Sequence, residues 1–302
     1  MFTLFSVPKP FRGHVATIQT NAVRSWTLLG SDHEIVLLGA DEGVAEVAER
    51  LGVRHVPHIQ VNAHGTPLMS SVFEQAQRVA THDWLCYVNC DIILTAGFAR
   101  AMRRGARIRR PVLVSGRRWR LDVDEQLDFE SGWERHLRRR VRAEGIRDGV
   151  GCMDYFAFRR GLVGDFPDFA LGRGRWDSVL PYRARAAGAL FVDATPRVLA
   201  VHQNHDYAIV TDGGDRRSKA GIKASAEGRA NGKLVPRDQK CTLGNADRRM
   251  ARWRLKRAFG QRLRYRLWLK LSEADRDTRI AGLSVRELRK KHKVKIKRML
   301  AG

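Results

Sequence analysis

The sequence predicts an α/β fold organised around a doubly wound, mostly parallel sheet. Short apolar segments alternate with amphipathic helical segments, and four such strand–helix units fall within about the first ninety residues. Strands that alternate with helices form parallel sheets because each helix carries the chain back to the same edge. With 302 residues and 43% hydrophobic content, the chain is long enough to bury a large core.

The elements of this alternation follow from local patterns. Each expected strand is a short apolar run, and each expected helix repeats apolar residues at three- and four-residue spacing. Pro8 ends the first strand, Gly52 ends the second helix, and Pro67 begins the third. In chain order we expect strand 3–7, helix 14–29, strand 34–39, helix 42–51, strand 53–56, helix 66–79, strand 84–88, helix 98–108 and strand 111–115.

After residue 115 the simple alternation stops. Arg117 begins a long polar excursion, and residues 122–147 are charged and helical in part. The further expected elements are strand 154–158, helix 178–187, strand 190–193 and strand 197–201. We therefore expect a domain over 1–210, a loop or linker over 211–244, and a basic helical C-terminal extension over 245–302.

The positive charge is concentrated in the C-terminal part. Residues 1–210 hold 28 Lys and Arg against 23 Asp and Glu, whereas residues 211–302 hold 28 against 9. Two basic helices are expected there, over 252–271 and 284–298. Three interpretations stay open: these helices pack on the domain, lie on an anionic membrane or bind nucleic acid.

Cysteine usage and hydropathy argue against several classes of protein. The four cysteines include no CxxC pair, so neither a structural zinc site nor a disulfide framework is expected. The chain has no run of eighteen apolar residues, and its first residues lack a basic region, so we expect neither a membrane-spanning helix nor a signal peptide. A cytoplasmic protein is expected.

One expected strand contains a short polar interruption. Residues 85–94 are apolar except at Asn89-Cys90-Asp91. Burying an unpaired carboxylate is costly, so Asp91 is expected where the strand ends, facing a cleft, a cation or a polar partner. Ligands of open α/β sheets bind at such strand ends. The alternative is that Asp91 caps a turn or a helix.

Further polar groups lie near expected strand and helix ends. His202 directly follows a strand and opens a cluster of amide, imidazole and carboxyl groups, in which His205 is the weaker candidate for a ligand. Residues 172–178 (GRGRWDS) lead into a helix, and Asp154 precedes an aromatic strand and follows a glycine-containing loop. The alternatives are loop hydrogen bonds for the histidines, a helix N-cap for Asp177 and a turn for Asp154.

Taken in order, these patterns resemble the nucleotide-sugar-dependent glycosyltransferases of the GT-A type, particularly the family-2-like enzymes, over about residues 1–210. The resemblance implies that Asp41 holds the nucleobase and that Asn89-Cys90-Asp91 holds a divalent cation, Mn²⁺ or Mg²⁺, on the diphosphate. It also implies that His202 is a further metal ligand. Asn89 departs from the family, which more often has a second aspartate there, and the lower negative charge weakens a metal site.

The resemblance also assigns residues to the acceptor. It implies that Trp176 shapes the acceptor pocket and that Asp177 removes the acceptor proton if the reaction inverts the sugar. Asp154 is a candidate for binding sugar hydroxyls. Arg175, or its neighbour Arg173, is a candidate for bidentate pairing with phosphate.

Two further segments, one polar and one basic, are weaker candidates for binding the donor or the acceptor. Ser6 and Pro8 lie at the end of the first strand, where the nucleotide should rest, although a simple loop explains them equally well. Residues 117–119 (RRW) either face the diphosphate or the acceptor or form a solvated basic edge, which is the commoner role of such runs.

The sequence therefore predicts an enzyme that transfers a sugar from a nucleoside-diphosphate donor to a hydroxyl acceptor, such as a glycan, a lipid-linked acceptor or an envelope polysaccharide. The main alternative is a non-catalytic protein of the same fold that binds nucleic acid or another polyanion through its basic extension. A nucleotidyltransferase would need a glycine-rich basic loop after the first strand, and residues 8–13 match that poorly. Beyond donor and acceptor, we expect contact of residues 245–302 with anionic membrane, ahead of nucleic acid.

Overall fold

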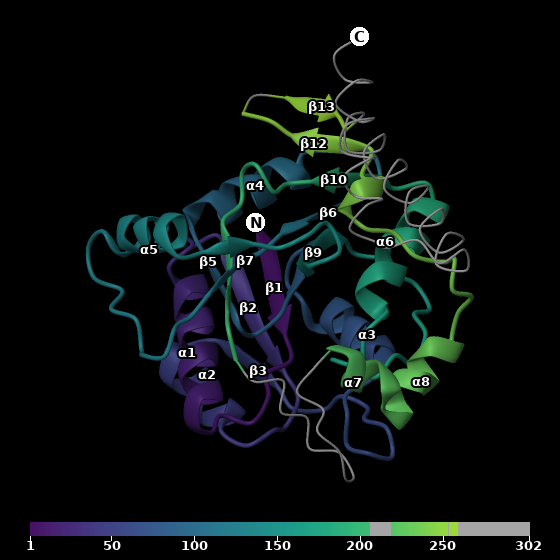
Figure 1. Cartoon of the computed structure of the whole chain (residues 1–302), viewed down its shortest axis with the longest axis horizontal. Helices are drawn as coiled ribbons and strands as arrows, with labels where there is room; N and C mark the ends of the chain where they lie inside the picture. The colour runs from purple at the N-terminus through teal and green to yellow at the C-terminus, as the bar shows by residue number, and fades with distance from the viewer. Residues whose placement is uncertain (206–218, 253, 259–302) are drawn as a thin grey trace, which may run out of the picture. The chain divides into compact units, whose positions relative to one another are not determined.

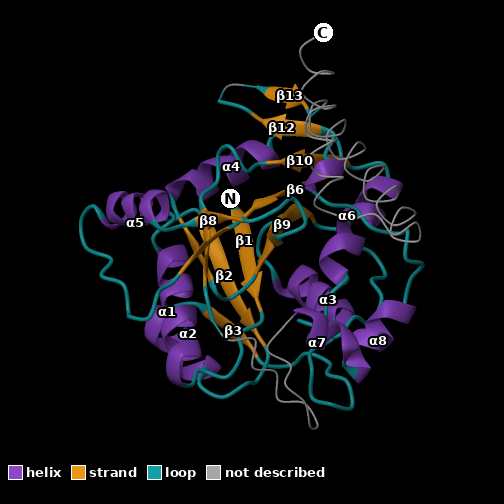
Figure 2. Ribbon diagram, viewed as in Figure 1, coloured by secondary structure: helices purple, strands orange, loops and turns teal. Residues whose placement is uncertain are grey.

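The computed structural model describes residues 1–205, 219–252 and 254–258. Figure 2 distinguishes its helices, strands and loops. The helices are α1 (Gly13–Thr27), α2 (Val44–Leu51), α3 (Met69–Val79), α4 (Ala96–Ala106), α5 (Trp133–Ala143), α6 (Trp176–Ala186), α7 (Lys219–Ala224), α8 (Ala226–Lys233) and the 3-10 helix η1 (Leu243–Asn245). The strands are β1 (Phe2–Ser6), β2 (His33–Leu38), β3 (Arg54–Val56), β4 (Trp84–Val88), β5 (Ile92–Leu94), β6 (Val112–Arg117), β7 (Trp119–Leu121), β8 (Ile146–Arg147), β9 (Met153–Arg159), β10 (Leu190–Asp193), β11 (Ala200–Gln203), β12 (Arg248–Met250) and β13 (Leu255–Arg257).

A large sheet forms the centre of the fold, and it confirms the predicted α/β class. Its strand order is β13-β12-β10-β6-β9-β4-β1-β2-β3. Most neighbours pair in parallel, but β9 runs antiparallel to both β4 and β6, and β13 runs antiparallel to β12. Because β9 is reversed, its first residues lie at the same edge as the last residues of β4 and β6.

A second, small sheet was not predicted from the sequence. Its order is β5-β11-β7-β8, and β11 pairs antiparallel with β5, so that His202 lies opposite Ile92. These strands have two to four residues each, too few to show a period of their own. The small sheet brings the chain near residue 202 back beside the end of β4.

Helices cover both faces of the large sheet, as Figure 1 shows. On one face α1, α2 and α4 bury apolar side chains such as Trp26 and Phe98 in one extended core. On the other face, aromatic rings of α3 and α6 pack edge-on against rings of β1 and β4, including Phe73 and Trp176 against Tyr87. Both faces are therefore fixed by close packing up to the edge where the polar residues gather.

The expected linker over 211–244 differs from the structure in its described part. Residues 219–233 form α7 and α8, and α8 is anchored by two buried polar side chains. Glu227 accepts hydrogen bonds from Asn62 and Arg173, and Asn231 bonds both the N–H and the C=O of Ala170. Short helices held by polar contacts rather than by an apolar stripe give no periodic signal in the sequence.

The expected boundary at residue 245 and the helix expected from residue 252 also differ from the structure. Strands β12 and β13 extend the large sheet, and the compact unit that contains this sheet runs over residues 1–257. The remainder of the two expected basic helices lies outside the described residues. Among the described residues, no helix is both long and apolar enough to cross a bilayer.

Candidate active site

Asp91 lies in the turn between β4 and β5. The apolar residues on both sides are fully buried, and the turn is closed by a hydrogen bond from the Ile92 N–H to the Asn89 carbonyl. The carboxylate is therefore held at the end of β4 by buried strands on either side. Its side chain is 17% exposed, which leaves it open on one side.

Two histidines converge on this carboxylate. Asp91 Oδ2 lies 3.3 Å from His202 Nε2 and 3.1 Å from His205 Nε2. The two rings are stacked with their centres 5.4 Å apart. One ligand atom from each of the three residues lies within 4.8 Å of the others, so the Asp91–His202–His205 cluster has the compactness of a metal site.

The electrostatics of this cluster suit a cation. Burial alone would raise the pKa of Asp91, but the neighbouring His202 and His205 hold it well below its usual range. Asp91 Oδ1 and His202 Nδ1 are buried and make no hydrogen bond within the described residues. A free carboxylate lone pair beside two imidazoles fits a divalent ion, and a set with two imidazoles suits Mn²⁺ better than Mg²⁺.

Asn89 and Asp154 are bonded to each other. The Asn89 side chain donates to Asp154 Oδ1 at 2.9 Å, and the Asn89 N–H donates to the Asp154 carbonyl. The other carboxylate oxygen of Asp154 accepts from the buried Arg118 at 2.9 Å, and Arg118 and Arg120 both pair with Asp148. Burial alone would raise the pKa of Asp148, but the two arginines hold it below its usual range. Asp154 is thus part of a buried network that fixes Asn89.

The charges of three carboxylates act on the hydroxyl of Tyr87. Burial and the negative charges of Asp91, Asp154 and Asp177 raise the pKa of its hydroxyl well above the usual value. Asp177 lies in the first turn of α6, and Trp176 beside it is 5% exposed, with its ring packed on Tyr87 at 4.9 Å between centres. The charge of Asp177 thus reaches Tyr87, as that of Asp91 does, and the structure places Trp176 in the aromatic core.

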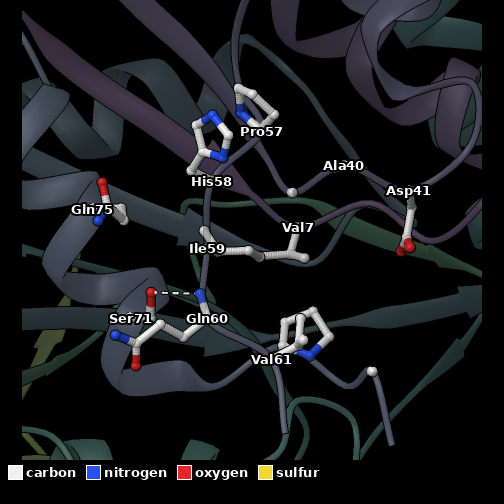
Figure 3. A pocket seen from close by; sticks show the side chains of 13 residues that line it. Val7, Ala40, Asp41, Pro57, His58, Ile59, Gln60, Val61, Ser71 and Gln75 are labelled. Atoms are coloured by element: carbon white, nitrogen blue, oxygen red, sulfur yellow. Dashed lines mark hydrogen bonds between the residues drawn. The ribbon is translucent and has the colours of Figure 1, made fainter.

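A cavity of about 530 Å³ lies at the same sheet edge, beyond the ends of β1, β2 and β3. Figure 3 shows Asp41 at one side of it, Val7 and Ile59 across its middle, and Gln75 of α3 on the far wall. The Gln60 N–H donates to Ser71 Oγ at 2.9 Å, which fixes the wall. Asp41 is an exposed residue, and the partial burial of its carboxyl raises its pKa.

Three other predicted residues have structural partners. Ser6 is buried and donates to the Val88 carbonyl at 2.6 Å, and Pro8 is buried as well. Arg175 caps α6 with φ of +73° and donates to the carbonyls of residues 232, 235 and 236. Its guanidinium therefore ties α6 to the last turn of α8 and to the residues that follow it.

Sequence reasoning missed two features of this site. His205, the weaker candidate, is as close to Asp91 as His202 is. Arg118, in a run interpreted mainly as a solvated edge, is 6% exposed and paired with two carboxylates. The His-x-x-His spacing was a usable signal for the first, whereas nothing local distinguishes Arg118 from its exposed neighbours.

No protein-family model matches the chain, and no curated protein does. Among solved structures it is similar to glucosyl-3-phosphoglycerate synthase from Mycobacterium tuberculosis, with 15% identity and a TM-score of 0.45 over 70% of this chain and 74% of that one. Other structures of that synthase contain Mg²⁺ with UDP, or Mn²⁺ with UDP-glucose. The chain is also similar to residues 1–349 of TarS from S. aureus, with 11% identity and a TM-score of 0.38 over 68% of this chain and 58% of that one.

Proposed function

We propose that the protein is a glycosyltransferase that moves a sugar from a nucleoside-diphosphate donor to a hydroxyl acceptor with the help of a divalent cation. The observation that carries this proposal is the Asp91–His202–His205 cluster, which the fold assembles at the end of β4 from residues over a hundred positions apart. Asp91 Oδ1, which is buried and has no hydrogen-bond partner among the described residues, is the second support, because it can serve as a ligand. The sequence resemblance to GT-A enzymes agrees with both.

The donor would occupy the sheet edge between the cavity and this cluster. Asp41 and the cavity wall would receive the nucleobase, because a carboxylate can accept hydrogen bonds from base N–H groups while the apolar wall covers the ring. Asp91, His202 and His205 would hold the cation. A bound cation neutralises charge that develops on the departing diphosphate.

The acceptor would approach from the side of α6. Asp177 is the proposed base for an inverting transfer, because its charge acts on the same tyrosine as the charge of Asp91. Asp154 would act by positioning Asn89, since both of its carboxylate oxygens already accept hydrogen bonds. Trp176 would act through packing, as the ring that holds the start of α6 against β4.

The proposal is tested by a donor screen. UDP-, GDP- and TDP-sugars are incubated with the protein and Mn²⁺, Mg²⁺ or a chelator, and release of the nucleoside diphosphate is measured. Wild type is compared with Asp91→Asn and with His136→Ala, which removes an exposed imidazole on α5 as a matched control. We expect turnover with Mn²⁺ that falls at least about a hundredfold in Asp91→Asn only. Absence of turnover and of donor-induced stabilisation with every donor would favour the non-catalytic alternative.

We further propose that the acceptor is lipid-linked or part of the envelope and that the basic extension contacts anionic membrane. In its described part, Arg254, Lys256 and Arg257 on or beside β13 are exposed. Sedimentation with phosphatidylserine vesicles should fall when these three are changed to Gln, and should fall in high salt. Equal binding to neutral vesicles would refute the contact.

A further inference from the structure

Three arginines gather at the ends of β6, β10 and β12, apart from the Asp91–His202–His205 cluster. Arg117 is the last residue of β6, and Arg249 lies opposite Asp193 where β12 pairs with β10. Arg147 pairs with Trp119, two residues beyond Arg117, and its guanidinium lies 5.6 Å from the centre of that ring. The strands β6, β8, β10 and β12, from four parts of the chain, thus bring the three arginine side chains to one edge of the fold.

The charges in this group are unbalanced. Burial, together with the positive charges of Arg147 and Arg249, lowers the pKa of Arg117. Among the residues that the structure describes, Asp193 is the carboxylate whose charge raises the pKa of Arg117, and it is fully buried. Its Oδ2 lies 3.7 Å from Arg249 Nε, too far for a hydrogen bond, while its Oδ1 accepts from the Thr195 N–H at 2.9 Å.

The same place holds buried donors without acceptors. Within the described residues, none of the three guanidinium groups donates a hydrogen bond, and Arg117 Nε and Arg249 Nε are buried. At the ends of β6 and β9, the hydroxyls of Ser115 and Tyr155 are also buried without a partner among the described residues, on opposite faces of the sheet, since Ser115 pairs with Phe156 and Tyr155 packs on Phe98. By contrast, Arg118 and Arg120 nearby both pair with Asp148. Unmet donors around an excess of positive charge favour an anion with several oxygen acceptors.

This arginine group adjoins the proposed acceptor side. Arg118, the residue after Arg117, bonds to Asp154, and Tyr155 follows Asp154 in β9. Arg117 and the network that fixes Asn89 therefore lie at the same edge of the sheet and are joined through adjacent residues of the chain. Guanidinium groups bind phosphate and carboxylate in bidentate fashion, which would also orient the rest of the ligand.

We propose that Arg117, Arg147 and Arg249 form an oxyanion site that binds a phosphate or carboxylate group of the acceptor. Arg117 and Arg249 form the floor because both are partly buried, and the exposed Arg147, stacked on Trp119, forms the rim. The assignment to the acceptor rests on the proposed function. Binding of the anion itself is independent of it.

The binding part is tested with inorganic phosphate. Titration calorimetry on the full chain compares wild type, Arg117→Gln with Arg249→Gln, and a control with Arg109→Gln and Arg110→Gln, which removes the same charge from an exposed stretch. We expect the dissociation constant to rise at least tenfold in the first double variant and less than twofold in the control. Equal affinity in all three proteins, or an equal loss in both double variants, would overturn the site. If the double variant does not fold, Arg117→Lys is measured instead, because it keeps the positive charge but removes the bidentate guanidinium. Weakened but measurable phosphate binding in this variant supports the site. Unchanged phosphate binding overturns the bidentate role of Arg117.

The acceptor part is tested by kinetics. Glycerol and glycerol 1-phosphate are compared as acceptors, with donor hydrolysis measured in parallel. In the double variant of Arg117 and Arg249 we expect KM for the phosphorylated acceptor to rise at least tenfold, with glycerol and donor hydrolysis unchanged. Equal effects on both acceptors would overturn the assignment to the acceptor. Absence of any donor turnover would instead be a failure of the proposed function, and the phosphate titration would still report on the site.

Discussion

The ion pair between Arg118 and Asp154 should contribute far more to stability than the surface ion pairs of this protein. Both side chains are 8% exposed, their N···O distance is 2.9 Å, and Asp154 also accepts from Asn89. Removing one partner of a buried pair costs about 3–5 kcal/mol, because the other charge stays buried without its partner. A charged hydrogen bond contributes about 1.5–3 kcal/mol, which is the coupling energy expected between the two residues.

A double-mutant cycle measures this coupling. Arg118→Met, Asp154→Asn and the double variant are unfolded in urea at pH 7 and followed by tryptophan fluorescence. The pair formed by Arg160 and Asp83, at 3.3 Å with Asp83 81% exposed, is the matched control, and its coupling should stay below about 1 kcal/mol. Coupling between Arg118 and Asp154 that is no larger than in the control would refute the reasoning that burial makes this network stabilising.

Three further predictions concern the core, the cluster and acid stability. Trp176→Ala should lower the free energy of unfolding by about 3–5 kcal/mol in urea, because the ring is buried among aromatic neighbours, and Trp176→Phe should cost clearly less. His205→Ala should weaken Mn²⁺ binding in calorimetry at least about tenfold, whereas His136→Ala should leave it unchanged. Burial alone would raise the pKa of Glu34, but hydrogen bonds from two threonines and an arginine hold it below 4.5. Its contribution to stability is therefore present above pH 4.5 and lost as the pH falls through the lower folded-state pKa, so Glu34→Gln should flatten that part of a stability curve measured by urea unfolding between pH 6 and 3.

Strands and helices of the first half were predictable because each shows its own period. The strand ending at Val88 and the helix around Trp26 lie within a residue or two of the expected bounds. The strand expected over 197–201 overlaps β11, but the small sheet itself was not predictable, because strands such as Ile92–Leu94 and Ala200–Gln203 are short and their pairing joins distant parts of the chain. The same holds for α8, whose anchors are polar.

The site residues that were identified from the sequence differ from those that were missed in the kind of residue and in its partners. Asp91 was identified because a carboxylate within an apolar run is anomalous by itself, and the structure brings His202 to it. Arginines carry no such local anomaly, since any of them can be solvated, bound to a carboxylate or bound to carbonyls. Arg118 and Arg175 were therefore assigned from sequence to edges and phosphates, while the fold gives them a buried carboxylate and three backbone carbonyls as partners.

The reversed strand β9 has a consequence for the order in which the large sheet forms during folding. In the large sheet it is the seam between two groups of strands, β4-β1-β2-β3 on one side and β6-β10-β12-β13 on the other. Strand β9 must pair with both β4 and β6, and its pairing with β4 joins residues far apart in the chain, which makes this step slow. Because Asp154 enters with β9 and bonds to Asn89, a refolding chain should regain the native fluorescence of Trp26, which packs beside β1, β2 and β4, before it regains any activity.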